Sequence, residues 1–222
     1  AGNVGATIAY TLSLDDVASE IVLIDINKDK VEGEVMDIVQ GTSFREPISV
    51  IAGEYEDAKD SDIVIITSGV GRKPGQTRID LAQTNVNVLK SIAPQITAYA
   101  PNAIYLIVSN PVDVMTYVFT KVSGIPEEQI IGSGTILDTS RLQSELAKRF
   151  YISPKNVHAH VYGEHGDSSF VPWSLVHIAN NHVDSYKESS PDRDRIHWDR
   201  DYEEVEQFVK KSGGVIIENK GA

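Results

Sequence analysis

Three short runs of apolar, mostly β-branched residues constrain the fold of this chain more than any other feature. They occupy residues 21–24, 62–67 and 103–109. Within each run the apolar residues are consecutive rather than alternate, which is typical of strands buried on both faces. Segments with helical spacing separate the runs, at residues 28–39 and 79–100. This alternation predicts an α/β fold built on a doubly wound parallel sheet.

Weaker signals complete the predicted order of elements. Past Gly132 the alternation loosens, so we place a domain boundary there: residues 1–132 form a Rossmann-type domain and residues 133–222 part of an α+β domain. Pro94 should kink or split the long helix that contains it. The remaining expectations are helices at 6–14 and 112–122, strands at 48–52 and 158–161, and a charged loop with a helix start at 187–200.

Composition excludes several classes of partner. The chain has 222 residues and a net charge of −12, which argues against nucleic acid and anionic membranes. It contains no cysteine, so disulfides and thiolate zinc sites are excluded. This composition fits a reducing compartment, and we expect a cytoplasmic protein without membrane spans. The glycine-rich start without a preceding strand and the uncapped end suggest an internal fragment, lacking the first strand and the C-terminal part.

A glycine turn followed by a distant aspartate suggests a dinucleotide site. Gly2 and Gly5 precede a helical stretch and have the spacing of the last two glycines in G-x-G-x-x-G. Such a turn lets backbone N–H groups approach a pyrophosphate. Asp25 ends the next strand, 20 residues after Gly5, where a carboxylate accepts the ribose hydroxyls of NAD and repels the 2′-phosphate of NADP. The alternative role for Asp25 is a helix N-cap.

Two motifs carry the residue types that the oxidation of a 2-hydroxy acid requires. Residues 163–168 (Gly-Glu-His-Gly-Asp-Ser) place His165 in a sharp turn. Asp138 and Arg141 are three residues apart, on one face of a helical turn. Together these residues offer a proton acceptor, an acid to orient it, and a planar fork for a carboxylate.

Two other classes of function compete with this interpretation. His158, His160 and His165 could indicate a metallohydrolase, but no carboxylate-rich motif accompanies them, and we predict no metal site. A non-catalytic NAD-binding protein would need the glycine turn alone. It would have no reason to combine His165 with Asp138 and Arg141.

Six ordered motifs resemble those of the lactate/malate dehydrogenase family, along nearly the whole chain, and most closely those of bacterial L-lactate enzymes. They are Ile24-Asp25, Lys73–Arg78, Ser109-Asn110-Pro111, Gly132–Thr135, Leu137–Arg141 and Gly163–Ser168. The resemblance implies NAD as the cofactor, a small 2-hydroxy or 2-oxo acid as the substrate, and a homo-oligomer, either a dimer or a tetramer. For the lactate branch it also implies a place in glycolysis and fermentation.

The resemblance also implies roles for individual residues. His165 would accept the hydroxyl proton, Asp138 would orient it, and Arg78 would polarise the carbonyl group. Arg141 would bind the substrate carboxylate, with Arg72, Arg78 and Asn110 as further substrate contacts. The implied cofactor contacts are Gly2, Asn3, Val4, Gly5, Asp25, Lys30, Thr67, Ser68, Gly69, Val108 and Asn110.

Two positions depart from the lactate pattern. Arg72 stands where lactate enzymes usually carry glutamine and malate enzymes arginine. A buried unpaired cation costs about 3–5 kcal/mol, so Arg72 favours a dicarboxylate such as oxaloacetate. The other motifs favour L-lactate, which we predict, with malate dehydrogenase activity as the alternative. Bacterial lactate enzymes often bind fructose 1,6-bisphosphate through an arginine and a histidine. Here His158 matches but Gln143 replaces the arginine, so we predict weak or absent activation and interpret His158 as a packed strand residue.

Overall fold

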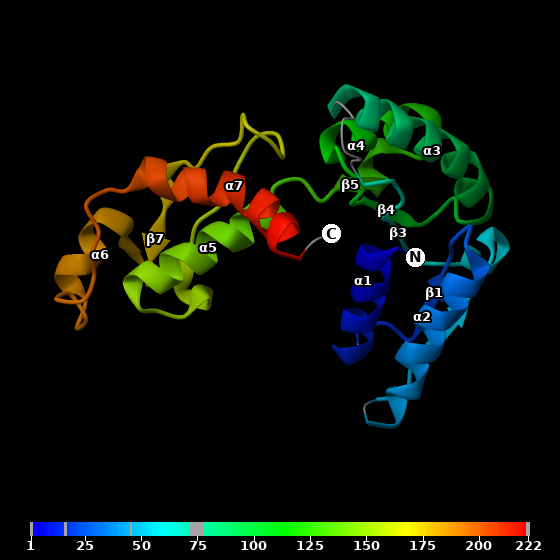
Figure 1. Cartoon of the computed structure of the whole chain (residues 1–222), viewed down its shortest axis with the longest axis horizontal. Coiled ribbons are helices and arrows are strands. Elements are labelled where there is room, and N and C mark those ends of the chain that lie inside the picture. Colours follow the sequence, from blue (N-terminus) through cyan, green and yellow to red (C-terminus); the bar gives the residue numbers. More distant parts are fainter. Residues whose placement is uncertain (1, 16, 45, 72–77, 221–222) are drawn as a thin grey trace. The chain divides into compact units, whose positions relative to one another are not determined.

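The computed structural model describes residues 2–15, 17–44, 46–71 and 78–220, with the backbone alone at 78–80. The chain divides into two compact units, Ala1–Gly132 and Ser133–Ala222 (Figure 1). Among the described residues, no helix is long and apolar enough to cross a membrane.

Unit 1 is built on parallel strands. β1 (Glu20–Leu23) pairs with β2 (Ser49–Ala52), while β3 (Ile63–Ile66), β4 (Ile104–Ile107) and β5 (Ile130–Gly132) form a second parallel group in the order β3–β4–β5. The chain thus builds outward from β1 to β2 and again from β3 to β5. In parallel α/β folds, ligands bind beyond the carboxyl ends of the strands. β1 and β3 are the first strands of the two groups.

Helices in unit 1 bury an apolar side against these strands. α1 (Asn3–Leu14) and α2 (Lys28–Gln40) pack on β1 and β2, and α3 (Arg78–Tyr99) and α4 (Val112–Val122) pack on the β3–β5 group. The second of these cores contains Leu89, Tyr105 and Phe119, all fully buried. Tyr105 donates a hydrogen bond to the carbonyl of Ala100, and burial raises its pKa to about 12. The parallel strands with covering helices that the apolar runs predicted are therefore present.

Unit 2 combines helices with a small antiparallel sheet. Its helices are α5 (Ile136–Phe150), α6 (Val183–Ser189) and α7 (Tyr202–Lys220), and its strands are β6 (Val157–His158), β7 (His177–Ile178) and β8 (Asn181–His182). Short 3₁₀ helices occupy Thr42–Phe44, Tyr55–Ala58, Glu127–Gln129, Pro154–Asn156 and Trp173–Leu175 of the two units. One buried cluster joins α5, α7 and the sheet, with Leu142, Phe150 and Trp198 among its members.

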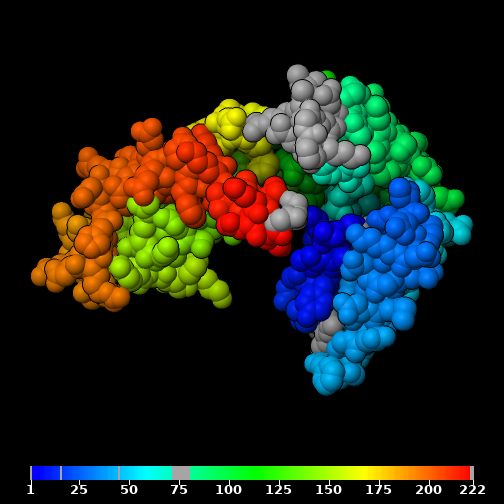
Figure 2. All heavy atoms as spheres, viewed as in Figure 1, coloured from blue at the N-terminus to red at the C-terminus, as the bar shows by residue number. Residues whose placement is uncertain are grey.

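Arg149 fastens α7 to α5. Its guanidinium contacts Glu145 on its own helix, and Asp201 and Glu204 at the start of α7, at 2.7–3.1 Å. Burial lowers the pKa of Arg149, but the hydrogen bonds that its guanidinium donates to Glu204 and Glu145 outweigh burial and raise the pKa overall. Figure 2 shows α7 on the visible surface of unit 2, in orange to red. Its other side packs on α5, which carries residues of the candidate site.

Three local expectations differ from the structure in part. Of the kink or split expected at Pro94, the split does not occur, because α3 is continuous. Pro94 and Lys90 both face solvent, where the Lys90 carbonyl that loses its helical partner can bind water, while Leu89 and Ala93 hold the helix to the core. The strand expected at 158–161 is limited to β6, and the expected loop at 187–200 begins inside α6.

His158 is not packed. Val157 and Ala159 are buried, so the intervening side chain points away from the core and is exposed. Gln143, the other residue at the expected effector position, donates a hydrogen bond to the carbonyl of Ala159 at 3.1 Å.

Candidate active site

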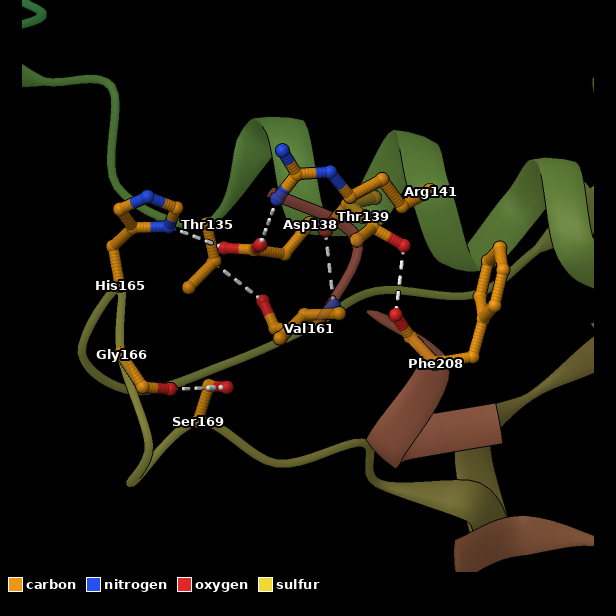
Figure 3. Close-up of polar contacts among 10 residues, drawn as sticks. Thr135, Asp138, Thr139, Arg141, Val161, His165, Gly166, Ser169 and Phe208 are labelled. Atoms are coloured by element: carbon orange, nitrogen blue, oxygen red, sulfur yellow. Dashed lines mark hydrogen bonds and ion pairs between the residues drawn. The ribbon is translucent and has the colours of Figure 1, made fainter. Parts of the chain in front are cut away.

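A single carboxylate lies at the centre of the candidate site in unit 2. Asp138, in the first turn of α5, has a side chain that is 8% exposed. Its Oδ2 lies 2.5 Å from Nδ1 of His165, and its Oδ1 accepts a hydrogen bond from Nη1 of Arg141 at 3.0 Å. Figure 3 shows the imidazole and the guanidinium converging on this carboxylate from opposite ends. The structure therefore brings together all three residues of the two sequence motifs.

The pairing with Asp138 determines which ring nitrogen of His165 carries a proton. An ionised carboxylate can only accept a hydrogen bond, so Nδ1 of His165 is the donor in this contact. In the neutral imidazole, the lone pair then lies on Nε2. His165 is partly exposed, with 26% of its side chain accessible. The arrangement gives a proton acceptor whose orientation is fixed from the opposite side of the ring.

The loop that carries His165 is closed at its base. Tyr162 and Phe170 exchange two backbone hydrogen bonds, of 2.9 and 3.0 Å. Inside the loop, Gly163 has φ +93°, a backbone conformation that favours glycine. Ser169 donates to the carbonyl of Gly166 through its hydroxyl group at 2.9 Å (Figure 3). These contacts make the turn around His165 compact.

Two threonines that the sequence analysis did not identify attach this loop to α5. The hydroxyl of Thr135 donates to the carbonyl of Val161 at 2.6 Å, and Thr139 Oγ1 accepts from the N–H of Val161 at 2.9 Å (Figure 3). Thr135 is the N-cap of α5 and Thr139 lies in its first turn, so the two threonines flank Asp138. They therefore hold the segment leading to His165 against the helix that carries Asp138 and Arg141. In the sequence, the signal that could have identified them is that the two threonines are four residues apart with Asp138 between them.

Arg141 retains hydrogen-bonding capacity beyond its contact with Asp138. Its side chain is 17% exposed, and its Nε–H is buried without a hydrogen-bond partner among the described residues. A buried donor without a partner costs about 1–3 kcal/mol, which an anion bound there would recover. α7 comes close to the guanidinium: a Cβ added at Gly213 would lie 3.4 Å from Nη2. The site thus combines an acceptor at His165 with a cation suited to a carboxylate.

In unit 1, the start of α1 approaches the end of β3. A Cβ added at Gly5 would lie only 2.9 Å from Oγ1 of Thr67, so this approach requires glycine. Gly2 is the N-cap of α1 and has space around it, with nothing within 4 Å of an added Cβ. No side chain caps the helix there, and Asn3 and Val4 are exposed in its first turn. A helix N-terminus of this kind can accommodate a phosphate group.

Asp25 lies two residues after the end of β1. Its Oδ1 accepts a hydrogen bond from the N–H of Asn27 at 2.9 Å. Burial raises the pKa of Asp25, but the Asn27 hydrogen bond leads the contributions that lower it overall, so the carboxylate is ionised. Lys30 Nζ donates to Oδ1 of Asn3 at 3.4 Å and thereby connects the starts of α1 and α2. The helix N-cap of α2 is Asn27, not Asp25.

The ends of β3 and β4 supply the remaining predicted cofactor contacts. Ser68 Oγ is buried without a hydrogen-bond partner among the described residues. Ser109 donates to the carbonyl of Ser68 at 2.6 Å, and the N–H of Val108 donates to the carbonyl of Ile66 at 2.9 Å. Asn110 is exposed at the end of this segment. The ionised Asp25, the glycine approach and the buried Ser68 hydroxyl fit the ribose and phosphate groups of a dinucleotide such as NAD.

Some predicted site residues lie outside the described part of the chain. These are Arg72 and the side chain of Arg78, whose backbone begins α3. Among the residues that are described, no three His, Asp or Glu side chains are arranged to hold a metal ion.

Two family models match the chain. Residues 1–132 match the lactate/malate dehydrogenase NAD-binding domain, and residues 135–222 match the lactate/malate dehydrogenase α/β C-terminal domain. The chain belongs to the lactate/malate dehydrogenase family. The matches confirm the α/β fold and NAD as the cofactor, both of which the sequence analysis expected.

Individual relatives lie on both branches of the family. An L-lactate dehydrogenase of Clostridium botulinum (strain Hall) is 48% identical over 223 residues, covering all of this chain and 69% of that protein. One from Clostridium perfringens (strain SM101) is 53% identical over 186 residues, covering 84% and 59%. Among solved structures, a lactate dehydrogenase from a deep-sea metagenome library has a TM-score of 0.92 at 40% identity, covering 100% and 69%. A malate dehydrogenase from Plasmodium falciparum has a TM-score of 0.90 at 28% identity, covering 100% and 69%.

Proposed function

We propose that this chain catalyses the reversible reaction (S)-lactate + NAD⁺ = pyruvate + NADH. The observation that carries the proposal is the Asp138 carboxylate, which contacts both the His165 imidazole and the Arg141 guanidinium. The relatives named L-lactate dehydrogenase, at 48% and 53% identity, support the same reaction. A non-catalytic NAD-binding protein would not need this cluster.

His165 moves the proton in this scheme. NAD, when bound, supplies the acceptor for the hydride that leaves C2 of lactate. As the C–H bond breaks, Nε2 of His165 takes the hydroxyl proton, and the C–O bond becomes the carbonyl of pyruvate. Asp138 orients the ring through Nδ1 and stabilises the imidazolium that forms. In the direction of pyruvate reduction, His165 returns the same proton to the carbonyl oxygen.

The arginines and Asn110 bind and polarise the substrate. Arg141 holds the carboxylate, since its Nε–H is a donor without a protein partner among the described residues. Arg78 polarises the carbonyl group at which negative charge develops during reduction. Asn110, exposed at the end of the β4 segment, contacts the substrate oxygen or the nicotinamide ribose.

The cofactor residues favour NAD over NADP. The ionised Asp25 accepts hydrogen bonds from the ribose hydroxyls and repels a 2′-phosphate. Gly2, Asn3, Val4 and Gly5 cradle the pyrophosphate at the start of α1. The remaining contacts are Lys30, Thr67, Ser68, Gly69, Val108 and Asn110.

Arg72 decides between pyruvate and oxaloacetate. We favour pyruvate because the relatives at 48–53% identity are named for lactate, whereas the malate dehydrogenase structure is 28% identical. Reduction of both acids by the complete gene product, followed through NADH absorbance, tests this choice. The proposal requires a higher kcat/KM for pyruvate. A higher value for oxaloacetate that Arg72→Gln abolishes would instead establish the malate reaction.

Catalysis itself is tested by His165→Gln. The variant should reduce pyruvate about 1,000-fold more slowly while NADH still binds, because general acid–base catalysis is typically worth 10²–10⁴-fold. A full rate in this variant would refute the proposed chemistry. Metal analysis of the active parent tests the metallohydrolase alternative.

Assembly, location and regulation belong to the same proposal. We propose a cytoplasmic homotetramer that acts in glycolysis and fermentation. Fructose 1,6-bisphosphate should leave the pyruvate half-saturation concentration nearly unchanged, since Gln143 is neutral and hydrogen-bonded to the carbonyl of Ala159. A large decrease on adding the bisphosphate would contradict this, and sedimentation analysis tests the tetramer.

A further inference from the structure

Asn85 is a buried polar side chain in unit 1 that no role in the proposed reaction explains. It lies near the start of α3, four residues after Leu81 and four before Leu89. All three residues are therefore on the side of the helix that faces the core. Only 3% of the residue is exposed. Burying an amide is unfavourable unless its hydrogen bonds are satisfied, so its partners determine its purpose.

The partners of Asn85 are backbone groups on two different segments. Its Oδ1 accepts from the N–H of Val70 at 2.9 Å. Its Nδ2 donates to the carbonyl of Asn110 at 2.8 Å and to the carbonyl of Val70 at 3.5 Å. One amide group thus connects the chain that follows β3 with the chain that follows β4.

The fit around this amide is close. A Cβ added at Gly69 would lie 3.2–3.3 Å from the Oδ1, Cγ and Nδ2 atoms of Asn85. Gly69 has φ +154°, which side chains rarely adopt, so glycine is favoured there on both grounds. Because residue 69 is glycine, the chain after β3 can pass close to the Asn85 amide. The N–H and the carbonyl of Val70 both form hydrogen bonds with that amide.

Other residue types cannot make this connection. Aspartate has the same shape but no N–H, so its carboxylate oxygen would face the carbonyl oxygen of Asn110. Leucine fills similar space but leaves the N–H of Val70 and the carbonyl of Asn110 without this partner. The amide is needed because it donates on one side and accepts on the other.

We propose that Asn85 is a positioning residue that fixes Asn110 and the Gly69–Val70 backbone for substrate turnover. The inference rests on the proposed function, since Asn110 is there a contact of the substrate and the nicotinamide. Loss of the connection shifts the backbone that carries Asn110. A displacement of about 1 Å at a reacting group costs about 100-fold in rate.

The test compares Asn85→Asp with Asn87→Asp in the complete gene product. Asn87 is two residues along the same helix, exposed, and accepts a hydrogen bond from Gln83, so its variant controls for the added charge. Asn85→Asp should lower kcat/KM for pyruvate about 100-fold, measured well below its melting temperature. NADH affinity should fall by a much smaller factor, because Gly69 and Asn110 are only two of the proposed cofactor contacts, and Asp25 and the α1 start are untouched. Asn87→Asp should match the parent.

The outcomes separate this inference from the proposed function. An inactive parent refutes the proposed function. An active parent with a folded Asn85→Asp variant of equal kcat/KM refutes the inference. If turnover and NADH affinity fall together by the same factor, Asn85 maintains the fold of unit 1 generally, and the inference also fails.

A measurement on the parent remains decisive if the variant does not fold. The amide of Val70 should exchange with deuterium at least tenfold more slowly than a solvated loop amide, although the residue is 44% exposed. Exchange at the rate of a solvated amide would show that the hydrogen bond to Asn85 is absent and would overturn the inference.

Discussion

The two units assemble their candidate sites in different ways. In unit 2, ionisable side chains contact one another directly, with Asp138 between His165 and Arg141 at 2.5 and 3.0 Å. In unit 1, the predicted contacts lie at strand ends and at one helix start, and the connecting hydrogen bonds involve the backbone, as at Asn85. We infer that unit 2 supplies the proton acceptor and the carboxylate-binding arginine, and that the strand ends of unit 1 supply a shaped surface for the cofactor.

This difference predicts which kinetic constant each unit controls. Substitutions among contacting charges change how protons and anions are held, so they should alter turnover. Substitutions of side chains that contact only the cofactor, such as Asp25, should alter affinity for NADH and leave turnover at saturation nearly intact.

The largest effect is expected for Asp138→Asn. An asparagine can present its N–H₂ group to Nδ1 of His165, which moves the ring proton to Nε2 and leaves no lone pair there for the substrate. It also removes the negative charge beside Arg141. We expect kcat/KM for pyruvate to fall about 1,000-fold, with NADH affinity unchanged.

The matched control is Asp194→Asn, an exposed aspartate of the same unit that lies 3.9 Å from Arg193. It should behave as the parent in stopped-flow and steady-state assays. Equal turnover in the Asp138 variant would mean that the carboxylate does not orient His165.

A smaller effect is expected for Asp25→Asn. The substitution removes a charged acceptor for ribose hydroxyls, and such hydrogen bonds contribute about 1.5–3 kcal/mol. The NADH dissociation constant should rise about tenfold, kcat at saturating NADH should stay near the parent value, and discrimination against NADPH should weaken. Fluorescence titration measures both affinities.

Asp29→Asn provides the control, since Asp29 is exposed one turn away in α2. A fall in kcat at saturating NADH, with unchanged affinity, would contradict the division of roles between the units.

Much of the fold followed from the sequence because burial leaves a visible pattern. The run at 21–24 predicted β1, and the three-residue spacing of Asp138 and Arg141 placed both on one turn of α5. Both features depend on residues that are close in sequence, or on whether a residue is apolar. The sequence pattern alone was therefore enough to predict them.

What the sequence did not reveal depends on backbone partners far along the chain. Asn85 bonds to groups 15 and 25 residues away, and Thr139 to a group 22 residues away. Every residue carries the same backbone N–H and C=O, so nothing in the sequence marks which of them accepts a side chain. The sequence shows only that a polar residue, Asn85, stands between Leu81 and Leu89 on the apolar side of a helix. The tertiary structure is needed to show which backbone groups it binds.

Unit 2 contains a second carboxylate, Asp184, that accepts hydrogen bonds from polar side chains but has no role in the proposed reaction. Its carboxylate accepts from the Tyr202 hydroxyl at 2.5 Å and from Trp198 Nε1 at 3.2 Å, away from the Asp138 cluster. Burial raises its pKa, but these hydrogen bonds and Arg200 lower it overall. Burial and Asp184 raise the pKa of Tyr202 to about 12.

We expect Asp184→Asn to lower the free energy of unfolding by about 2 kcal/mol at pH 7 without changing kcat/KM. Because the folded pKa is depressed, this stabilisation is present above the unfolded value near 4 and is lost as pH falls through the folded value. The difference between parent and variant in urea titrations should therefore shrink below about pH 4. A constant difference down to pH 2 would mean that the carboxylate charge is not involved.

The smallest effect is expected at two adjacent glycines inside α7. Glycine costs about 1 kcal/mol relative to alanine in a helix interior. An added Cβ at Gly214 would meet nothing within 4 Å, whereas at Gly213 it would lie 3.4 Å from Nη2 of Arg141. Both alanine variants should thus raise the free energy of unfolding by roughly 0.5–1 kcal/mol. Only Gly213→Ala should also raise the pyruvate KM, because it narrows the space beside the guanidinium that we assign to the carboxylate. If Gly214→Ala changes the KM equally, α7 acts on turnover through its rigidity, and the contact with Arg141 has no special part in binding.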